Sequence, residues 1–229
     1  MRVIVNEVLV EKRAGMAQRA VTIGLMLLIA AMLLSFNPRF VLLAYGILLP
    51  GLVVINWGAR TAGKWLRKPR VDQMLAKALK GLGRGHRLYS YLLPAEHVIL
   101  SPAGLFILKV KLQDGKISCR GEKWHRRFTL GLLLRLFSEE WLGNPSKQAR
   151  SETEKVRHFV TSYLPDIDVP MQPVVVFADP KAEIDVTEPT VPVMPLRDLK
   201  AYLRRSTEEK AMPRETLKAL TDLFDEQAA

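Results

Sequence analysis

The sequence predicts an α/β protein in which an N-terminal two-helix transmembrane hairpin precedes a domain built on a mixed central sheet. No charged residue lies between Arg19 and Arg39 or between Arg39 and Arg60, which leaves uncharged runs of 19 and 20 residues. A helix needs roughly 20 apolar residues to cross a bilayer. Downstream, short apolar runs rich in β-branched residues are interspersed with helical patterns, which is typical of a layered α/β domain.

We expect the two spans to cover residues 20–37 and 40–59, joined by the turn Ser35–Arg39. Pro50 and Gly51 lie at the centre of the second span and predict a kink, which spanning helices tolerate. A cleaved signal peptide and a pair of buried core helices are the alternatives. Nineteen residues precede the first run and a second run follows at once, so the hairpin is favoured over both.

Basic residues give the orientation of the hairpin. Only Arg39 lies in the connecting turn, whereas basic residues flank the hairpin on both outer sides. The positive-inside rule then predicts a two-span protein of the cell membrane with both termini in the cytoplasm, residues 1–19 being a cytoplasmic N-terminal segment. The single cysteine, Cys119, agrees with a reducing compartment. The flanking residues are Arg2, Lys12, Arg13 and Arg19 on one side and Arg60, Lys64, Arg67, Lys68 and Arg70 on the other.

The net charge of +11 is concentrated just after the hairpin. Residues 60–150 carry a net charge of +13, whereas residues 1–59 carry +3 and residues 151–229 carry −5. For the juxtamembrane linker, residues 60–70, anionic lipid headgroups are the favoured partner, because each basic residue near such a surface contributes roughly 1 kcal/mol. Nucleic acid phosphate is a second partner, and a solvated basic face is the third interpretation.

Residues 71–195 are expected to form the α/β domain and residues 196–229 a pair of peripheral C-terminal helices. Asp114-Gly115 is a turn signal that predicts a hairpin between its two flanking strands. Pro145 after Asn144 marks a helix start. The apolar stretch 128–142 is too short to span and reads as a core helix or, second, an interfacial one. The strands are predicted at 87–93, 97–100, 105–112, 116–120, 173–177 and 191–195, and the helices at 71–81, 144–164, 197–204 and 214–226.

No nucleophilic triad, phosphate-binding loop, dinucleotide motif or metal-ligand spacing is present in the sequence. One local pattern stands out. It runs Glu96-His97-Val98-Ile99-Leu100-Ser101-Pro102, then Gly104-Leu105-Phe106-Ile107-Leu108-Lys109-Val110-Lys111, followed by Gly115, Trp124 and Asn144-Pro145 with Gln148. Over roughly residues 70–180 this pattern resembles the nuclease-related domain, called NERD, of the PD-(D/E)xK nuclease-like superfamily.

The resemblance implies an αβββαβ core and metal-assisted phosphodiester hydrolysis, in which acidic side chains hold Mg²⁺ and a lysine assists. Glu96 takes the position of the first motif acid, Lys111 that of the motif lysine and Gln148 that of the helix glutamine, and Asp72 would be the acid of the first helix. The sequence departs from the motif at Lys109, where the second acid is expected. Hard cations prefer oxygen ligands, so a lysine there repels Mg²⁺.

Three interpretations follow. The first is a catalytically degenerate module without a cofactor, in which Lys109 and Lys111 bind phosphate or another anion on a nucleic acid, phosphate-bearing or protein partner at the membrane surface. The second gives these lysines no particular role and makes the chain a membrane scaffold or a binder of anionic lipid. The third is an active Mg²⁺-dependent nuclease in which Asp114 or Glu122 supplies the missing carboxylate. The oligomeric state stays open, with a homo-oligomer as one option, because Gly24 and Gly46 permit close helix packing.

Overall fold

The computed structural model describes residues 1–83, 85–127, 141–209 and 211–228. These residues divide into two compact units. One unit holds residues 7–70, and the other holds residues 1–6, 71–127 and 142–229. The second unit is therefore discontinuous in sequence, because the first is inserted after its opening six residues.

The inserted unit is a pair of long helices. Helix α1 covers Glu7–Ser35 and helix α2 covers Val41–Trp65, with a single 3₁₀ turn, η1, at Pro38–Phe40 between them. The Asn37 side chain accepts a hydrogen bond of 3.0 Å from the backbone N–H of Arg39 and so caps this turn. Helix α2 continues through Pro50. Both helices are long and apolar enough to cross a membrane, as the sequence predicted.

Small residues hold the two helices together. A Cβ atom on Gly24 would lie 2.7 Å from the backbone nitrogen of Ile55, and one on Gly58 would lie 2.8 Å from that of Val21. Gly46 has no atom within 4 Å of its Cβ position and takes no part. Buried small residues recur at intervals of seven on both helices: Ala17, Gly24 and Ala31 on α1, and Ala44, Gly51 and Gly58 on α2.

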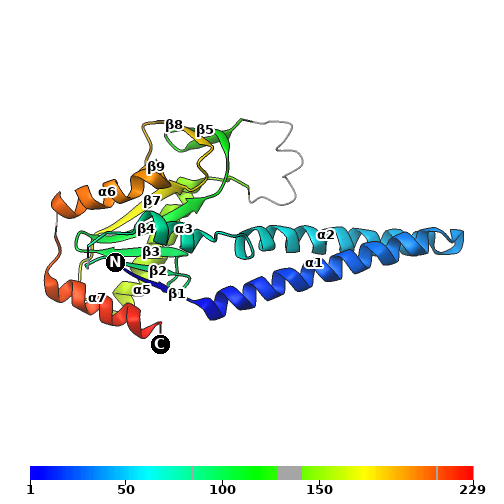
Figure 1. The fold of residues 1–229 in the computed structure, drawn as a ribbon, viewed down its shortest axis with the longest axis horizontal. Coiled ribbons are helices and arrows are strands. Elements are labelled where there is room, and N and C mark those ends of the chain that lie inside the picture. Colours follow the sequence, from blue (N-terminus) through cyan, green and yellow to red (C-terminus); the bar gives the residue numbers. More distant parts are fainter. Residues whose placement is uncertain (84, 128–140, 210, 229) are drawn as a thin grey trace. The chain divides into compact units, whose positions relative to one another are not determined.

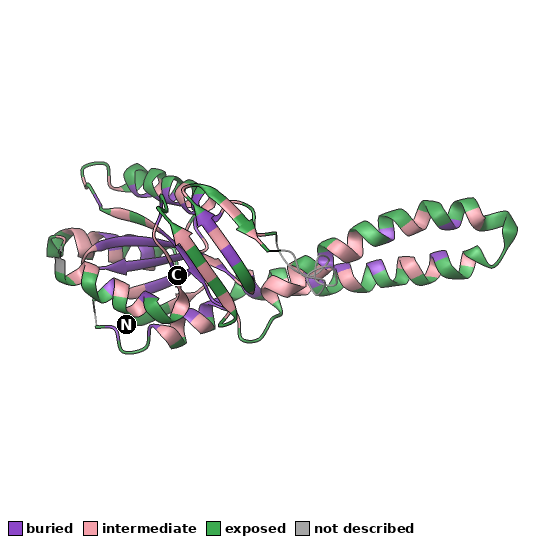
Figure 2. Ribbon diagram, turned by 90° about the horizontal axis from the view of Figure 1, so that it is seen from above, coloured by how far each residue is buried: buried purple, intermediate pink, exposed green. Residues whose placement is uncertain are grey.

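The large side chains of the hairpin lie on its outside. Leu42 is 87% exposed, Val53 69% and Met26 63%. Figure 2 shows exposed residues along both helices, in contrast to the buried central strands of the other unit. Helices in the core of a soluble protein bury such residues, so this distribution disfavours the core-helix alternative.

A mixed sheet forms the centre of the other unit, as predicted. Its strands are β1 (Arg2–Val5), β2 (Arg87–Ser90), β3 (His97–Ser101), β4 (Gly104–Lys111), β7 (Met171–Phe177) and β9 (Val193–Pro195), in the order β1-β2-β3-β4-β7-β9. The pairs β2–β3 and β3–β4 are antiparallel. The pairs β1–β2, β4–β7 and β7–β9 are parallel.

Helices cover both faces of this sheet (Figure 1). Helices α3 (Val71–Ala78) and α6 (Leu196–Glu209) pack on one face, and α5 (Pro145–Tyr163) and α7 (Arg214–Glu226) on the other. The prediction that the C-terminal helices are peripheral is wrong. Leu203 of α6 and Phe224 of α7 are fully buried in the two core clusters, because each helix has an amphipathic face directed at the sheet.

A second, smaller sheet corrects the predicted hairpin. It contains β5 (Gly115–Arg120), β6 (Lys123–Arg126) and β8 (Ala182–Thr187) in the order β6-β5-β8. Gly115 has a φ of +79°, which glycine adopts readily, and it is the first residue of β5. However, the Gly115 N–H bonds to the carbonyl of Lys181, 3.1 Å away, so β5 runs parallel to β8 and does not fold back on β4.

Strand β1 was not predicted. The Arg2 N–H bonds to the His86 carbonyl and the Asn6 N–H to the Ser90 carbonyl, both at 3.1 Å, which places this strand at the edge of the central sheet. Residues 1–19 thus contain a strand of the α/β unit and the start of α1. In the stretch 128–142, for which we predicted a core or interfacial helix, residues 128–140 lie outside the described part of the chain.

Candidate functional site

The two motif lysines lie on the face of β4 that α5 covers. Side chains alternate along a strand, so Lys109 and Lys111 continue the row begun by Leu105 and Ile107. Leu105 and Ile107 pack in one core cluster with Val156 of α5. Lys109 is 7% exposed and Lys111 only 1%, so the chain places two ammonium groups inside the protein.

Lys109 is paired with two carboxylates. Its Nζ atom donates a hydrogen bond of 2.6 Å to Oε1 of Glu152, and it lies 3.7 Å from Oε1 of Glu96. The register of β3 and β4 pairs His97 with Leu108, which brings Glu96, just before β3, beside Lys109. The Lys109 side chain is 9% exposed and that of Glu152 14%. Removing one partner of a buried pair typically costs 3–5 kcal/mol, because a buried charge is left uncompensated.

Glu152 was not predicted to be part of the site. It lies four residues after Gln148 on α5, and residues four apart share one face of a helix. That spacing was the available signal for its position. Both residues line a shallow hollow of about 390 Å³ on α5, whose walls are Asn144, Lys147, Gln148, Ser151, Glu152 and Lys155.

Gln148 lies next to the glycine that precedes α5. Gly143 has a φ of +57°, and a Cβ there would come within 2.9 Å of Nε2 of Gln148. The Oε1 atom of Gln148 and the Oε2 atom of Glu152 are buried and have no hydrogen-bond partner among the described residues. The structure thus gathers Glu96, Lys109, Glu152 and Gln148 on the α5 side of the sheet.

Asp72 lies in a different layer. It belongs to the first turn of α3, on the helix that packs against the opposite face of the central sheet, and it is 2% exposed. Lys111 pairs in register with Phe177 of β7, and its carbonyl accepts a hydrogen bond of 2.8 Å from Ala178. The anion-binding role of Lys109 and Lys111 stays a prediction. The ion pair of Lys109 with Glu152 already neutralises its charge.

The two carboxylates considered as replacements for the missing acid are paired elsewhere. Asp114 accepts a hydrogen bond of 2.6 Å from Nη2 of Arg126, and Glu122 forms an ion pair with Arg150. No group of three or more histidine, cysteine, aspartate or glutamate side chains with the geometry to hold a metal occurs in the described residues. The donor set around Lys109 therefore does not fit Mg²⁺, which needs several oxygen ligands in near-octahedral geometry.

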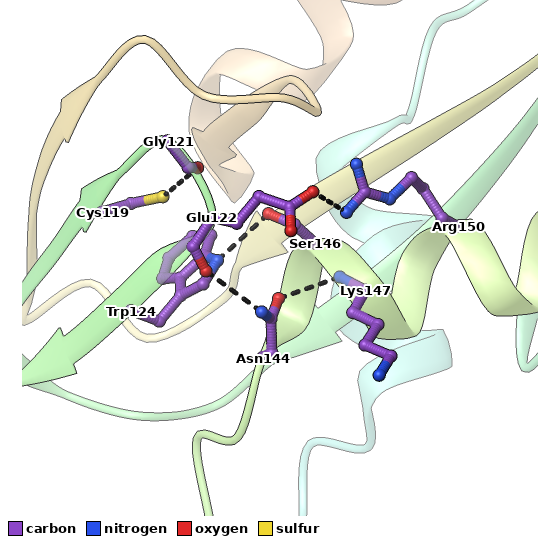
Figure 3. Close-up of polar contacts among 8 residues, drawn as sticks. All are labelled: Cys119, Gly121, Glu122, Trp124, Asn144, Ser146, Lys147 and Arg150. Carbon is purple, nitrogen blue, oxygen red and sulfur yellow. Dashed lines mark hydrogen bonds and ion pairs between the residues drawn. The ribbon is translucent and has the colours of Figure 1, made fainter.

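A polar network fixes the start of α5 against the small sheet (Figure 3). The Asn144 carboxamide oxygen caps the helix by accepting a hydrogen bond of 2.9 Å from the Lys147 N–H, and its nitrogen donates one of 3.0 Å to the Glu122 carbonyl. Trp124 Nε1 donates a bond of 3.0 Å to the Ser146 hydroxyl. The predicted Asn-Pro helix start is thereby confirmed.

The predicted lipid-facing residues surround the end of α2. Arg60, Arg67 and Lys68 are exposed. The Lys64 ammonium lies 5.6 Å from the centroid of the Trp65 ring. Arg70 forms an ion pair of 2.8 Å with Glu7 at the start of α1, so its charge is compensated within the hairpin unit. Contact of these residues with headgroups stays a prediction.

Comparison with known proteins supports the resemblance seen in the sequence. Residues 65–178 match the family model of the nuclease-related domain, NERD. The match contains β2 to β6, α5 and β7, and with them the cluster around Lys109. No curated protein and no solved structure gives a match. The chain therefore carries a nuclease-related domain of the NERD family, preceded by two helices that are long and apolar enough to span a membrane.

Proposed function

We propose that this protein is a membrane-anchored nuclease-related module that has lost hydrolytic activity and acts by binding a partner at the cytoplasmic membrane surface. The observation that carries the proposal is the position of Lys109. Its ammonium lies 2.6 Å from a Glu152 oxygen and 3.7 Å from a Glu96 oxygen, where it supplies the positive charge between two carboxylates. In an active PD-(D/E)xK site a divalent metal supplies that charge.

An ammonium cannot replace the metal in catalysis. A bound divalent ion polarises the phosphate and lowers the pKa of a water molecule, whereas a lysine paired with Glu152 does neither. The candidate substitutes Asp114 and Glu122 are held by Arg126 and Arg150. These contacts support a degenerate site and disfavour an active, rearranged one.

The chain topology supports the membrane anchor and its orientation. Strand β1 lies in the same sheet as β2, and only Asn6 separates it from α1. Five residues, Leu66–Arg70, separate α2 from α3. Both ends of the hairpin are therefore joined by short connections to one folded unit, which requires both ends on one side of the membrane. The flanking basic residues support the cytoplasm as that side.

The test uses the full chain in lipid nanodiscs, because a fragment without residues 1–6 would lack β1. We expect no cleavage of single- or double-stranded DNA or RNA with Mg²⁺ or Mn²⁺, and no Mn²⁺-dependent rise in the unfolding temperature. Lys109→Glu restores the motif acid and should give measurable Mn²⁺ stabilisation. Lys218→Glu, an exposed site on α7 with the same change in charge, is the matched control.

Metal-dependent cleavage by the natural chain that Glu96→Ala abolishes would contradict the proposal. Should Lys109→Glu fail to fold, Lys109→Met provides the second test, since it removes the internal ammonium without adding a charge. Mn²⁺ stabilisation of the natural chain equal to that of Lys109→Met would equally overturn the assignment of Lys109 as the internal cation.

A further inference from the structure

The outer face of the small sheet carries a row of basic side chains. Along β5, Ile117 and Cys119 are buried, whereas Lys116 and Arg120 are exposed on the other side. The register pairs Arg120 with Lys123, and the Arg127 N–H donates a bond of 2.9 Å to the Lys116 carbonyl, so pairing with β6 continues beyond the strand. The exposed residues of this face, called the basic strip below, are Lys116, Arg120, Lys123, His125 and Arg127.

Three basic side chains of the strip have no acidic partner among the described residues. Arg120, Lys123 and Arg127 make no ion pair with any residue that the structure describes. Lys116 lies 3.7 Å from Glu183, and both side chains are more than 60% exposed (63% and 69%), which makes this pair weak. Elsewhere Lys109, Arg126 and Arg150 are each paired with a carboxylate.

The strip is held in a fixed position. Glu122, in the turn between β5 and β6, forms an ion pair with Arg150 of α5, and its carbonyl accepts a bond of 3.0 Å from Asn144 (Figure 3). On the inner side, Trp124 packs against Phe177 with ring centroids 5.9 Å apart. The basic side chains therefore project from a rigid platform, which lowers the entropic cost of binding.

The shape of the charged area selects the kind of partner. The strip is two strands wide, about 5 Å between neighbouring strands, and its residues 123, 125 and 127 on the β6 side follow one another about every 6.6 Å. The third strand, β8, carries Glu183 and Asp185 on the same face, exposed and paired in register with Lys116 and Ser118. A broad anionic membrane would meet those carboxylates, whereas a single linear polyanion can follow β5 and β6 alone.

We propose that the basic strip binds the sugar-phosphate backbone of a single-stranded nucleic acid, outside the Lys109 cluster. No exposed aromatic side chain other than His125 is present on the strip for bases to stack on, so binding is expected to depend on phosphate charge and not on sequence. This inference names the partner that the proposed binding role requires and rests on that role.

The test measures fluorescence anisotropy of a labelled 20-nucleotide DNA or RNA strand with the full chain in phosphatidylcholine nanodiscs, between 50 and 200 mM salt. The triple variant Arg120→Gln, Lys123→Gln and Arg127→Gln removes three phosphate contacts. At about −0.7 per contact, the slope of log affinity against log salt should change from about −3 to about −1. The matched control removes three exposed charges on α6 and α7: Arg205→Gln, Arg214→Gln and Lys218→Gln.

We expect the strip variant to lose about tenfold or more in affinity at 50 mM salt and the control to keep its affinity and slope. Equal losses in both variants, or no binding by the natural chain, would overturn the inference. Binding of anionic vesicles through the strip, in a chain that binds no nucleic acid, would also overturn it and would assign the strip to lipid. These outcomes are independent of the cleavage assay. A chain that neither cleaves nor binds nucleic acid would refute nucleic acid binding by the strip and leave the proposed loss of hydrolytic activity intact.

Discussion

The hairpin and the α/β unit distribute side-chain size in opposite ways. In the hairpin, glycine and alanine lie between the helices and Leu42 and Val53 point outward, 87% and 69% exposed. In the α/β unit, Ile107 and Phe177 are buried at 0% and 1% exposure, and charged groups cover the surface. Water drives large apolar groups inward, whereas lipid gives no such preference and leaves close backbone packing as the main attraction. The difference is the one expected if the hairpin lies in lipid, as proposed, and the α/β unit in water.

The largest expected difference between the units comes from shortening one large apolar side chain in each. Ile107→Ala should lower the free energy of unfolding of the α/β unit by about 2–5 kcal/mol, because a cavity forms in the core. Met26→Ala, at a position 63% exposed on α1, should change the stability of the hairpin by less than about 0.5 kcal/mol. Hydrogen exchange of each unit in nanodiscs measures both. A comparable loss in the two variants would remove the contrast.

Enlarging the small residues tests the same contrast from the hairpin side. Gly58→Leu should destabilise the helix pair by about 1–3 kcal/mol, because the added atoms meet the backbone of Val21. Gly46→Leu adds the same atoms where no neighbour lies within 4 Å and serves as the control. Denaturation in a graded detergent mixture reports the helix pairing. If both variants behaved alike, the helices would not meet along their small residues.

A smaller effect is expected at the surface of the α/β unit, where Asp225 joins α7 to the edge of the sheet. Its carboxylate pairs with Arg87 and accepts a bond of 2.8 Å from the Tyr89 hydroxyl, and Arg2 of β1 lies 3.4 Å away. Burial alone would raise the pKa of Asp225, but the hydrogen bonds from Arg87 and Tyr89 outweigh it and lower the pKa below that of a free aspartate. Asp225→Asn should cost about 1 kcal/mol at pH 7.

The pH dependence of this effect follows from the sign of the shift. A carboxyl group with a lowered pKa in the folded state stabilises the fold above its unfolded pKa, and this contribution disappears as the pH falls through the folded value. The natural chain and Asp225→Asn should therefore differ in urea midpoint at pH 7 and converge below about pH 4. A constant difference across that range would show that the aspartate acts through packing and not through its charge.

Local signals in the sequence predicted the elements that depend on local interactions. Asn144 and Pro145 start α5 because capping and a fixed proline φ act within one turn. The continuous apolar run of β4 was recognisable because this pattern of a buried strand lies entirely in consecutive residues. The two long apolar runs of the hairpin were visible for the same reason.

Elements that depend on distant partners were not predictable in this way. Strand β1 pairs with residues 85 positions later, and β8 joins β5 from 67 positions away, so neither partner shows in a local window. The Asp114-Gly115 pair predicted a hairpin with β4, but it could not reveal that β5 would pair with β6 and β8. Within the site, the charge reversal at Lys109 was evident, but its pairing with Glu152 required the packing of α5 on β4.

The position of β1 constrains the order in which the protein can be assembled. A ribosome releases residues 2–5 before the hairpin and residues 87–90 after it, so the edge of the sheet cannot close until both apolar helices have been synthesised. In the proposed anchor, a helix pair inserted with its first helix reversed would leave β1 on the far side of the bilayer, away from β2. Closure of the sheet would then serve as a check on correct insertion.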